Sequence, residues 1–593
     1  MPTLSRFSSS LLLATVALTA GPKLSNDLAN LPATSQVRVN IRFKNPADAA
    51  KHGRLQKQHG ATLRNSNDDV KGATYQMPSR SLAALENDPD IEYVSIDRRV
   101  QGSLDYTLET TGANIAAQYG LDGQTIGVAV IDSGMKNLTD FQDPRTGRSR
   151  IVYSESFLPA CDTASSSNTS TAPVTAMATD STIATDSLSG FAPSAGCANS
   201  SADDFYGHGT HVAGIIGGAG LKSTGRAYSY TIRGLAPRVS FINLRALDAQ
   251  GGGYDSYVIA AINRAIQLKG RYNIRIMNLS LGRQVMESYA KDPLAQAVKA
   301  AWEAGIVVVC AAGNRGRDNT MNTQGYGTIS SPGNSPWVIT VGSMKSQSTA
   351  SRADDTIASY SSKGPTLLDH VVKPDLVAPG NRIDSVSCSS CTLNTANLAN
   401  RTLYETYATQ LKGPSPDYFS LSGTSMATPV VSGTVALMLQ KTPGLTPDQV
   451  KARLMRTATK TFPRQSTVVE NGVTYTSYYD IFTIGAGYLD TWAALNDTRL
   501  LSGRALSPVA VFDKASGKAR FVYANNVVWG DNVIWGSNVV WGDSVFVGGS
   551  NVIWGDSLIW NGTGASNVVW GDNVVWGDTT LGGTSNAEVR GEN

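Results

Sequence analysis

Short, mostly apolar runs recur through the middle of the chain, and stretches with helical periodicity lie between them. The runs cover residues 126–131, 239–244, 274–279, 306–310 and 337–341. Runs without a clear polar face are typical of strands buried on both sides, as in a parallel sheet. Helical stretches such as 257–268 and 294–304 would connect these strands and cover both faces of the sheet. Residues from about 104 to 497 are therefore predicted to form an α/β domain.

Composition excludes several classes of protein. The 593 residues include 50 basic and 47 acidic side chains, so the net charge of +3 gives no support for a nucleic-acid binder. No apolar run reaches the roughly 18 residues that a membrane-spanning helix needs. A hydrophobic share of 41% argues against a wholly disordered chain. At about 150 residues per domain, the length also excludes a single small binding module.

The N-terminus has the three-part pattern of an export signal. Arg6 precedes an apolar stretch from Leu11 to Ala20, and a small residue follows it. We expect residues 1–21 to be a secretory signal peptide, which would make the protein secreted and extracellular or associated with the cell surface. The alternative is a disordered N-terminus.

A second small unit is expected between residues 36 and 100. Residues 37–43 alternate apolar and polar side chains, and residues 91–96 do so again, which is typical of half-buried strands. Residues 81–86 have a helical pattern. This part of the chain is predicted to be a small α+β unit.

Five cysteines suit an exported protein with a few disulfides. Cys161 and Cys197 bracket a Ser/Thr/Ala-rich stretch, and Cys388 and Cys391 are close neighbours. We predict these two pairings, although spacing alone does not fix connectivity. A redox role for the second pair is disfavoured because no thioredoxin-like βαβ pattern surrounds it. Cys310 lies in an apolar run and is expected to be buried and unpaired.

The C-terminal region repeats a six-residue unit, Asn-Val-Val-Trp-Gly-Asp, between residues 525 and 578. An even period places equivalent side chains on one face of an extended strand, and its Val and Trp residues favour strands. We predict a β-rich module of stacked strands; the alternative is a low-complexity tail that orders only on contact. Trp and Val left exposed would offer a contact to a cell surface, a glycan or a partner.

Three short motifs in the α/β domain carry reactive side chains. Asp132 ends an apolar strand and precedes a Ser-Gly turn, His208 lies between two glycines, and Ser425 opens a helical stretch that continues through residues 430–440. Polar groups at the carboxyl ends of parallel strands are the usual site-forming groups of such sheets. Each motif alone is weak, since Asp is a common turn residue and Ser a common helix cap.

The histidines narrow the choice of a base. His52 and His59 lie in the small N-terminal unit, which leaves His208, His211 and His370. Only His208 has flanking glycines, which allow another segment to approach the imidazole closely. A zinc site is disfavoured because the His-x-x-His spacing lacks the usual i, i+4 pair and a nearby Glu.

Together and in this order, the three motifs resemble the signatures of the subtilisin-like serine peptidases, the subtilases. The resemblance covers about residues 104–497, with insertions, and implies a three-layer α/β fold with a parallel sheet. It also implies a serine endopeptidase that works through an acyl-enzyme. Ser425 would be the nucleophile and His208 the general base and acid, while Asp132 would orient the imidazole and stabilise its charged form.

Further segments resemble the family's oxyanion hole and substrate edge. Asn314 follows Ala-Ala-Gly and would donate its side-chain N–H to the oxyanion, beside the Ser425 backbone N–H. The implied substrate-binding residues are Ser280, Leu281, Gly282 and Gly313. Residues 330–333 resemble the family's stretch that closes the pocket for the substrate residue preceding the cleaved bond. None of these segments contains an acidic residue, so no strict preference for basic side chains is expected.

The small N-terminal unit also ends like a subtilase propeptide, on residues 88–98. The resemblance implies a zymogen whose propeptide, residues 36–100, assists folding, inhibits the active site and is removed by autoprocessing near residues 100–103. The alternative is an independent small domain.

The resemblance implies no cofactor for the chemistry. Asp140 lies at nearly the family spacing for one calcium ligand, but the Asn-rich loop expected after the His motif is absent, so calcium stays open. Residues 161–200 and 382–418 are insertions, and the second precedes Ser425 closely enough to shape a cleft. Protein or peptide substrates are the expected partners. The alternative is that the chain is a surface adhesion or structural protein whose function depends on the repeats.

Overall fold

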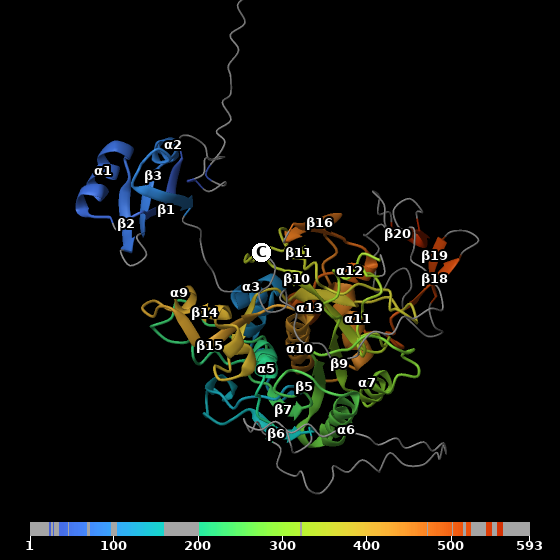
Figure 1. Cartoon of the computed structure of the whole chain (residues 1–593). Helices are drawn as coiled ribbons and strands as arrows, with labels where there is room; N and C mark the ends of the chain where they lie inside the picture. The colour runs from blue at the N-terminus through green and yellow to red at the C-terminus, as the bar shows by residue number, and fades with distance from the viewer. Residues whose placement is uncertain are drawn as a thin grey trace, which may run out of the picture. The chain divides into compact units, whose positions relative to one another are not determined.

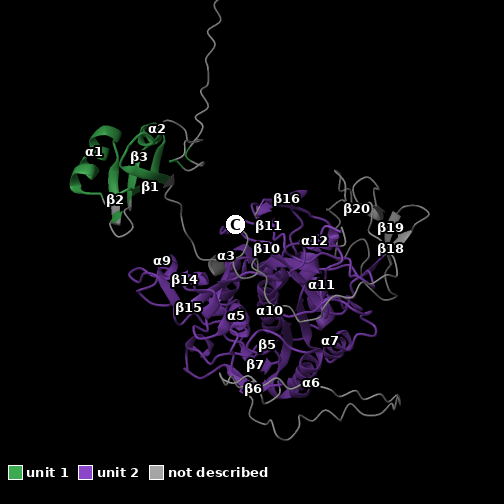
Figure 2. Cartoon of the chain, in the orientation of Figure 1, with its two compact units in different colours: residues 1–100 green, residues 101–593 purple. Residues whose placement is uncertain are grey.

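The structure, a computed structural model, divides the chain into two compact units, residues 1–100 and 101–593 (Figure 2). The structure describes residues 23–24, 28, 35–45, 47–67, 72–96, 103–158, 201–320, 323–470, 472–500, 502–513, 518–522, 541–547 and 554–560. The predicted signal peptide and the Cys161–Cys197 pair lie outside these residues. In the described part of the chain, no helix has the length and hydropathy needed to cross a bilayer.

The first unit is a four-stranded antiparallel sheet in the order β2-β3-β1-β4. Its elements are β1 (Gln36–Phe43), α1 (Ala49–His59), β2 (Thr62–Asn67), β3 (Gly72–Pro78), α2 (Leu82–Leu85) and β4 (Ile91–Ile96). The inward side chains of β1 alternate along the strand, so Val39, Ile41 and Phe43 are buried beside Leu55 of α1. Both strands and the short helix predicted from the sequence are present.

The second unit is built on an eight-stranded, mainly parallel sheet in the order β11-β10-β9-β8-β5-β7-β6, with β12 also paired to β10 (Figure 1). The strands are β5 (Gly127–Asp132), β6 (Ile151–Ser156), β7 (Ser240–Arg245), β8 (Ile274–Leu279), β9 (Val307–Ala311), β10 (Ile339–Lys345), β11 (Thr356–Ile357) and β12 (Leu376–Pro379). Only β11 runs antiparallel to its neighbour. All five predicted strands are present, and the predicted parallel sheet is confirmed.

Two pairs of helices pack on this sheet and complete a three-layer α/β fold. In one layer α5 (His208–Gly217) lies against α10 (Thr424–Lys441), which packs over β8, β9 and β10. In the other, α6 (Asp255–Tyr272) lies against α7 (Pro293–Glu303). Outside the insertion before Ser425, the other α-helices described in this unit are α3 (Ser103–Thr111), α4 (Ala113–Ala116), α11 (Pro447–Thr457), α12 (Ile481–Ile484) and α13 (Thr491–Asn496).

The predicted insertion before Ser425 forms a small sheet of its own. Its elements are β13 (Ile383–Val386), α8 (Thr392–Ala396), β14 (Arg401–Leu403), α9 (Tyr404–Tyr407) and β15 (Pro414–Leu421), with strand order β13-β15-β14. The predicted Cys388–Cys391 disulfide is present in the connection between β13 and α8. Cys310 is buried and unpaired, as predicted.

The C-terminal part contains two groups of strands. The β16 (Gln465–Glu470) and β17 (Val473–Tyr478) hairpin precedes α12, and β18 (Val509–Asp513) pairs with β19 (Lys518–Val522). Within the predicted repeat module the structure describes β20 (Trp541–Val547) and β21 (Trp554–Trp560), which pair in parallel. The rest of the repeat lies outside the described residues, so its stacking stays a prediction.

Candidate active site

The carboxyl ends of β5, β7 and β8 meet at one edge of the sheet, and Asp132 is the last residue of β5. His208 is the first residue of α5, which packs against this edge. His208 Nδ1 lies 2.8 Å from Asp132 Oδ1. The two side chains are 6% and 1% exposed, so little water competes for this hydrogen bond.

Glycines allow this close approach. A Cβ on Gly209, in the first turn of α5, would lie 2.2 Å from the carbonyl oxygen of Gly134. Gly134 itself has a φ of 109°, which favours glycine in the turn after β5. The small residues that surround Asp132 and His208 therefore set the distance between their side chains.

The hydrogen bond fixes the tautomer of His208. A carboxylate only accepts hydrogen bonds, so Nδ1 carries the proton that it donates to Asp132, and in the neutral ring Nε2 is the basic nitrogen. The same Asp132 oxygen accepts the Ser133 backbone N–H at 2.8 Å, which holds the carboxylate in place. This is the arrangement of a general base with an orienting carboxylate.

The other two candidate histidines have different surroundings. His211 Nε2 donates to the carbonyl oxygens of Phe419, at 2.8 Å, and Ile383, at 3.1 Å. Burial lowers the pKa of His211 to about 3, so this side chain is neutral and ties α5 to the small sheet of the insertion. Burial also lowers the pKa of His370, which lies in the turn after residue 366.

Ser425 occupies the second position of α10, after Gly423, whose φ is 147°. Its hydroxyl donates to the Ser280 carbonyl oxygen at 3.1 Å, and the Ser280 hydroxyl donates back to the Ser425 carbonyl oxygen at 2.8 Å. Ser425 is partly exposed, whereas its neighbours Thr424 and Met426 are buried. The N-terminus of this 18-residue helix favours negative charge that develops beside Ser425.

Asn314 lies at the same helix end, as the sequence predicts. Its Oδ1 accepts from the Thr424 backbone N–H at 2.9 Å and from the Thr424 hydroxyl at 3.0 Å. Thr424 Oγ1 in turn accepts the Gly313 backbone N–H at 3.1 Å. Because Oδ1 accepts from both the backbone N–H and the hydroxyl of Thr424, the Asn314 amide is held with its oxygen toward the N-terminus of α10.

Two of the predicted substrate-binding residues, Gly282 and Gly313, lie close to Ser330. A Cβ on Gly282 would lie 2.9 Å from Ser330 Cβ, and one on Gly313 would lie 2.4 Å from Ser330 Oγ. The stretch Ser280–Gly282 follows directly after β8, and the Leu281 side chain is only 7% exposed. Leu281 can therefore contribute its backbone to this edge rather than its side chain.

An acidic residue that the sequence did not indicate contacts the neighbouring Ser331. Asp292 is fully buried and accepts the Ser331 hydroxyl at 2.7 Å. It also pairs with Arg283, whose guanidinium lies 2.9 Å away and contacts Asp255 as well. The only local signal was an Asp before a Pro at the start of α7, which is typical of a helix cap. Its charge is compensated by Arg283.

Asp140 does not fit a calcium ligand. Its two carboxylate oxygens accept the Tyr418 hydroxyl at 2.8 Å and the Lys222 backbone N–H at 3.1 Å. The Arg150 guanidinium donates to the Asp140 carbonyl oxygen at 2.8 Å, so a positive group already lies there. Burial raises the pKa of Asp140, which also disfavours the charged ligand. Within the described ranges, no group of three or more His, Cys, Asp or Glu side chains could hold a metal ion.

The sequence of the chain is similar to the sequences of known serine proteases. The model of the subtilase family matches residues 123–475. Serine protease AprX of Bacillus subtilis (strain 168) is 32% identical over 412 residues, which cover 68% of this chain and 77% of that protein. Subtilisin DY of Bacillus licheniformis is 36% identical over 256 residues, or 43% and 72% of the two chains. An extracellular serine proteinase of Thermus sp. (strain Rt41A) is 29% identical over 400 residues, or 66% and 71%. The chain therefore belongs to the subtilase family and is a serine endopeptidase.

Proposed function

We propose that the chain is a secreted serine endopeptidase that cleaves peptide bonds with Asp132, His208 and Ser425 as its triad. The observation that carries the proposal is the 2.8 Å hydrogen bond between His208 Nδ1 and Asp132 Oδ1. With Nδ1 donating to Asp132, His208 Nε2 is the proposed base. The resemblance of the Ser425 segment to the family's serine motif supports Ser425 as the nucleophile. No cofactor enters the chemistry.

In the acylation step, Ser425 Oγ attacks the carbonyl carbon of the scissile peptide while His208 Nε2 takes the hydroxyl proton. The resulting oxyanion accepts hydrogen bonds from Asn314 Nδ2 and the Ser425 backbone N–H. His208 then gives its proton to the leaving amine, and the C–N bond breaks. Asp132 stabilises the positive imidazolium throughout.

In deacylation, His208 Nε2 takes a proton from a water molecule, whose oxygen attacks the ester carbon. Collapse of the second tetrahedral intermediate returns that proton to Ser425 Oγ and releases the new carboxyl end. Enzyme and base are regenerated, so the net reaction is hydrolysis of one peptide bond.

The substrate is proposed to bind as an extended strand along Ser280–Gly282, with Gly313 on the opposite wall. The absence of a side chain at Gly282 and Gly313 lets the peptide backbone approach. We expect no strict preference for basic residues before the cut, because Arg283 already neutralises the nearby Asp292.

Residues 36–100 are proposed as the propeptide of a zymogen, removed by the enzyme itself near residues 100–103. Support comes from their separation as a compact unit with its own hydrophobic core. Secretion is supported by the signal-like residues 1–21 and by the extracellular relative from Thermus. The repeats are proposed to contact a cell surface or glycan.

Labelling with a fluorophosphonate probe tests the proposal. The purified protein should be labelled on Ser425, as found by peptide mass spectrometry, and the Ser425→Ala variant should be neither labelled nor active. The same variant should retain the residues before position 100. Hydrolysis by the unlabelled Ser425→Ala variant would refute the triad, whereas normal processing of that variant would refute autoprocessing alone. The second result would assign maturation to another protease.

A further inference from the structure

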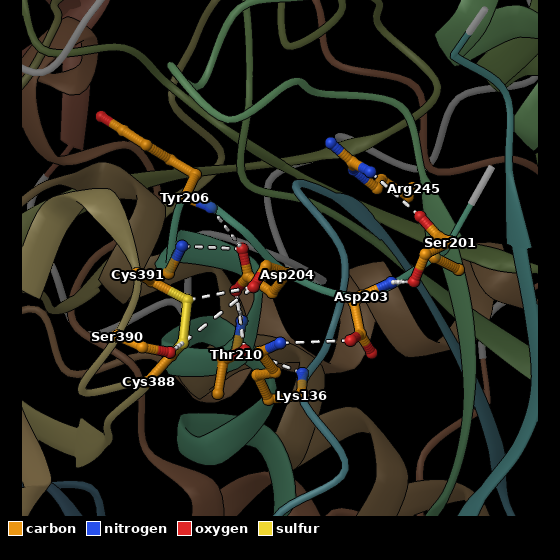
Figure 3. Close-up of polar contacts among 12 residues, drawn as sticks. Lys136, Ser201, Asp203, Asp204, Tyr206, Thr210, Arg245, Cys388, Ser390 and Cys391 are labelled. Carbon is orange, nitrogen blue, oxygen red and sulfur yellow. Dashed lines mark hydrogen bonds and ion pairs between the residues drawn. A yellow bond between two sulfur atoms is a disulfide. The ribbon is translucent and has the colours of Figure 1, made fainter. Parts of the chain in front are cut away.

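A second buried carboxylate lies beside the Asp132–His208 pair. Asp204 precedes α5 and is 0% exposed. Its Oδ2 accepts the Thr210 backbone N–H at 2.8 Å and the Thr210 hydroxyl at 2.7 Å (Figure 3). Its Oδ1 accepts the Gly207 backbone N–H at 2.7 Å, the Tyr206 backbone N–H at 3.1 Å and the Ser133 hydroxyl at 2.9 Å. The Asp204 carboxylate therefore accepts hydrogen bonds from five donor groups.

These contacts link the segments that carry Asp132 and His208. The Ser133 hydroxyl donates to Asp204 and accepts the Gly209 backbone N–H at 2.9 Å. The Ser133 backbone N–H meanwhile donates to Asp132 Oδ1. One carboxylate thus holds the residue that follows Asp132 and residues on both sides of His208.

Helix capping alone does not account for this arrangement. A cap would need only the bonds from Gly207 and Thr210 at the start of α5. The additional bond from Ser133 joins the turn after β5 to the first turn of α5, and these are the two segments whose spacing sets the His208–Asp132 distance. In a buried site each charged hydrogen bond is strong, so the spacing is held firmly.

The Cys388–Cys391 disulfide of the insertion lies against the backbone of Asp204. Cys391 Sγ lies 3.0 Å from the Asp204 carbonyl oxygen (Figure 3). The next two residues pair with the following backbone: Thr392 N–H donates to the Phe205 carbonyl at 3.0 Å and Leu393 N–H to the Tyr206 carbonyl at 2.9 Å. The segment that leads into His208 is therefore fixed on its backbone as well as through the Asp204 side chain.

We propose that Asp204 is a positioning residue for catalysis: it acts through Ser133 and the first turn of α5 to hold His208 against Asp132. The proposal rests on the triad described under the proposed function. Asp204 touches neither the substrate edge at Ser280–Gly282 nor Asn314 in any contact of the described residues. Its loss should therefore lower kcat and leave KM nearly unchanged.

The test compares Asp204→Asn with Asp203→Asn in the full chain. Asp203 is the matched control, because its carboxylate is 49% exposed and pairs with Lys136 at the surface. Active sites are first counted by complete fluorophosphonate labelling, and kcat and KM are then measured per labelled site on a small peptide ester and amide. A purely structural role would lower the number of labelled sites but not kcat per site.

Asp204→Asn keeps the shape of the side chain but turns one acceptor oxygen into a donor that faces other donors. We expect kcat per labelled site to fall about tenfold to a hundredfold, as small misplacements of catalytic groups do, and the labelling rate to fall in parallel. Asp203→Asn should stay within twofold of the unmodified enzyme. Equal kcat per site in the two variants would overturn the proposal.

Two milder variants apply if Asp204→Asn does not fold. Ser133→Ala removes the link between Asp204 and the Gly209 backbone, and Thr210→Val removes one of the five donors. Each should lower kcat per labelled site severalfold with KM unchanged, and normal kcat in both would overturn the proposal. The triad is tested separately, since its failure would appear as activity in Ser425→Ala whatever the Asp204 variants do.

Discussion

The Tyr418 hydroxyl donates a 2.8 Å hydrogen bond to Asp140 Oδ2, which joins β15 of the insertion to the 3-10 turn Thr139–Phe141 between β5 and β6. Both side chains are buried, and the Arg150 guanidinium donates to the backbone carbonyl oxygen of Asp140. A bond between a phenol and an acid therefore occupies the position for which the sequence suggested a calcium ligand.

Removal of this hydroxyl should destabilise the fold and spare the chemistry. In Tyr418→Phe a buried carboxylate loses one partner, so the free energy of unfolding should fall by about 1–3 kcal/mol while kcat stays unchanged. Urea denaturation measures the change in the Ser425→Ala background, which prevents autolysis. Tyr119→Phe is the control, because Tyr119 is 67% exposed. Equal stability of the two variants would contradict a structural role for the Tyr418–Asp140 bond.

The free energy of unfolding is expected to depend on pH through the side chain of Asp355. Burial raises the pKa of this side chain to about 7; the Tyr488 hydroxyl opposes the rise, Asp354 adds to it and Arg352 opposes it more weakly. An unfolded Asp loses its proton near pH 4, so between about pH 4 and 7 the folded state binds more protons. The free energy of unfolding should therefore fall as pH rises through this window.

Asp355→Asn should remove that slope, and the variant should gain stability relative to the parent as pH rises from 4 to 8. Urea denaturation at several pH values, with both proteins carrying Ser425→Ala, gives the comparison. A constant stability difference between the two proteins across this range would show that Asp355 does not titrate with a raised pKa.

The Cys388–Cys391 disulfide closes a short loop, so its entropic contribution to stability should be about 2 kcal/mol. The Cys388→Ser, Cys391→Ser double variant should unfold at a lower temperature. It should also lose part of its kcat, because Cys391 contacts the backbone of Asp204. Thermal unfolding followed by circular dichroism, together with kcat per labelled site, measures both effects. Cys310→Ala is the comparison, since Cys310 forms no disulfide. An unchanged kcat in the double variant would show that the disulfide contributes to the stability of the fold and not to catalysis.

The packed unit extends past Asp497. Ser507 Oγ donates to Asp375 Oδ1 at 2.6 Å and accepts from Lys451 Nζ at 2.9 Å, deep in the core beside Lys373. Residues 508 and 510 also pair with the backbone at 370–372.

A truncation after Asp497 should therefore destabilise or unfold the enzyme, because it leaves this buried charge cluster without Ser507. A truncation after Val522 keeps Ser507 and the β18–β19 pair, and it should hydrolyse small peptides normally. Yield, melting temperature and kcat per labelled site of the two proteins provide the test. A stable, active protein that ends at Asp497 would show that the segment around Ser507 is dispensable.

Local patterns of the sequence predicted the parallel strands. They also indicated the segments around Asp132 and His208 as candidates for the active site. The strand predictions succeeded because apolar runs are local signals. The glycine-flanked motif is also local, and the structure brings His208 within 2.8 Å of Asp132. Asp204, Asp292 and Tyr418 were missed for a common reason: their roles depend on partners far away in the chain, and each alone is typical of a turn, a cap or a strand. Spacing within a sequence does not reveal such partners, whereas the folded backbone does.

The most direct test of the account is the kinetics of Ser425→Ala, His208→Ala and the double variant on one small peptide amide. If the two residues act as one unit, each single variant should lose about 10⁶-fold in kcat, and the double variant should be little slower than either. Circular dichroism should show that all three remain folded. Near-normal turnover in either single variant, or losses that multiply in the double variant, would contradict the proposed triad.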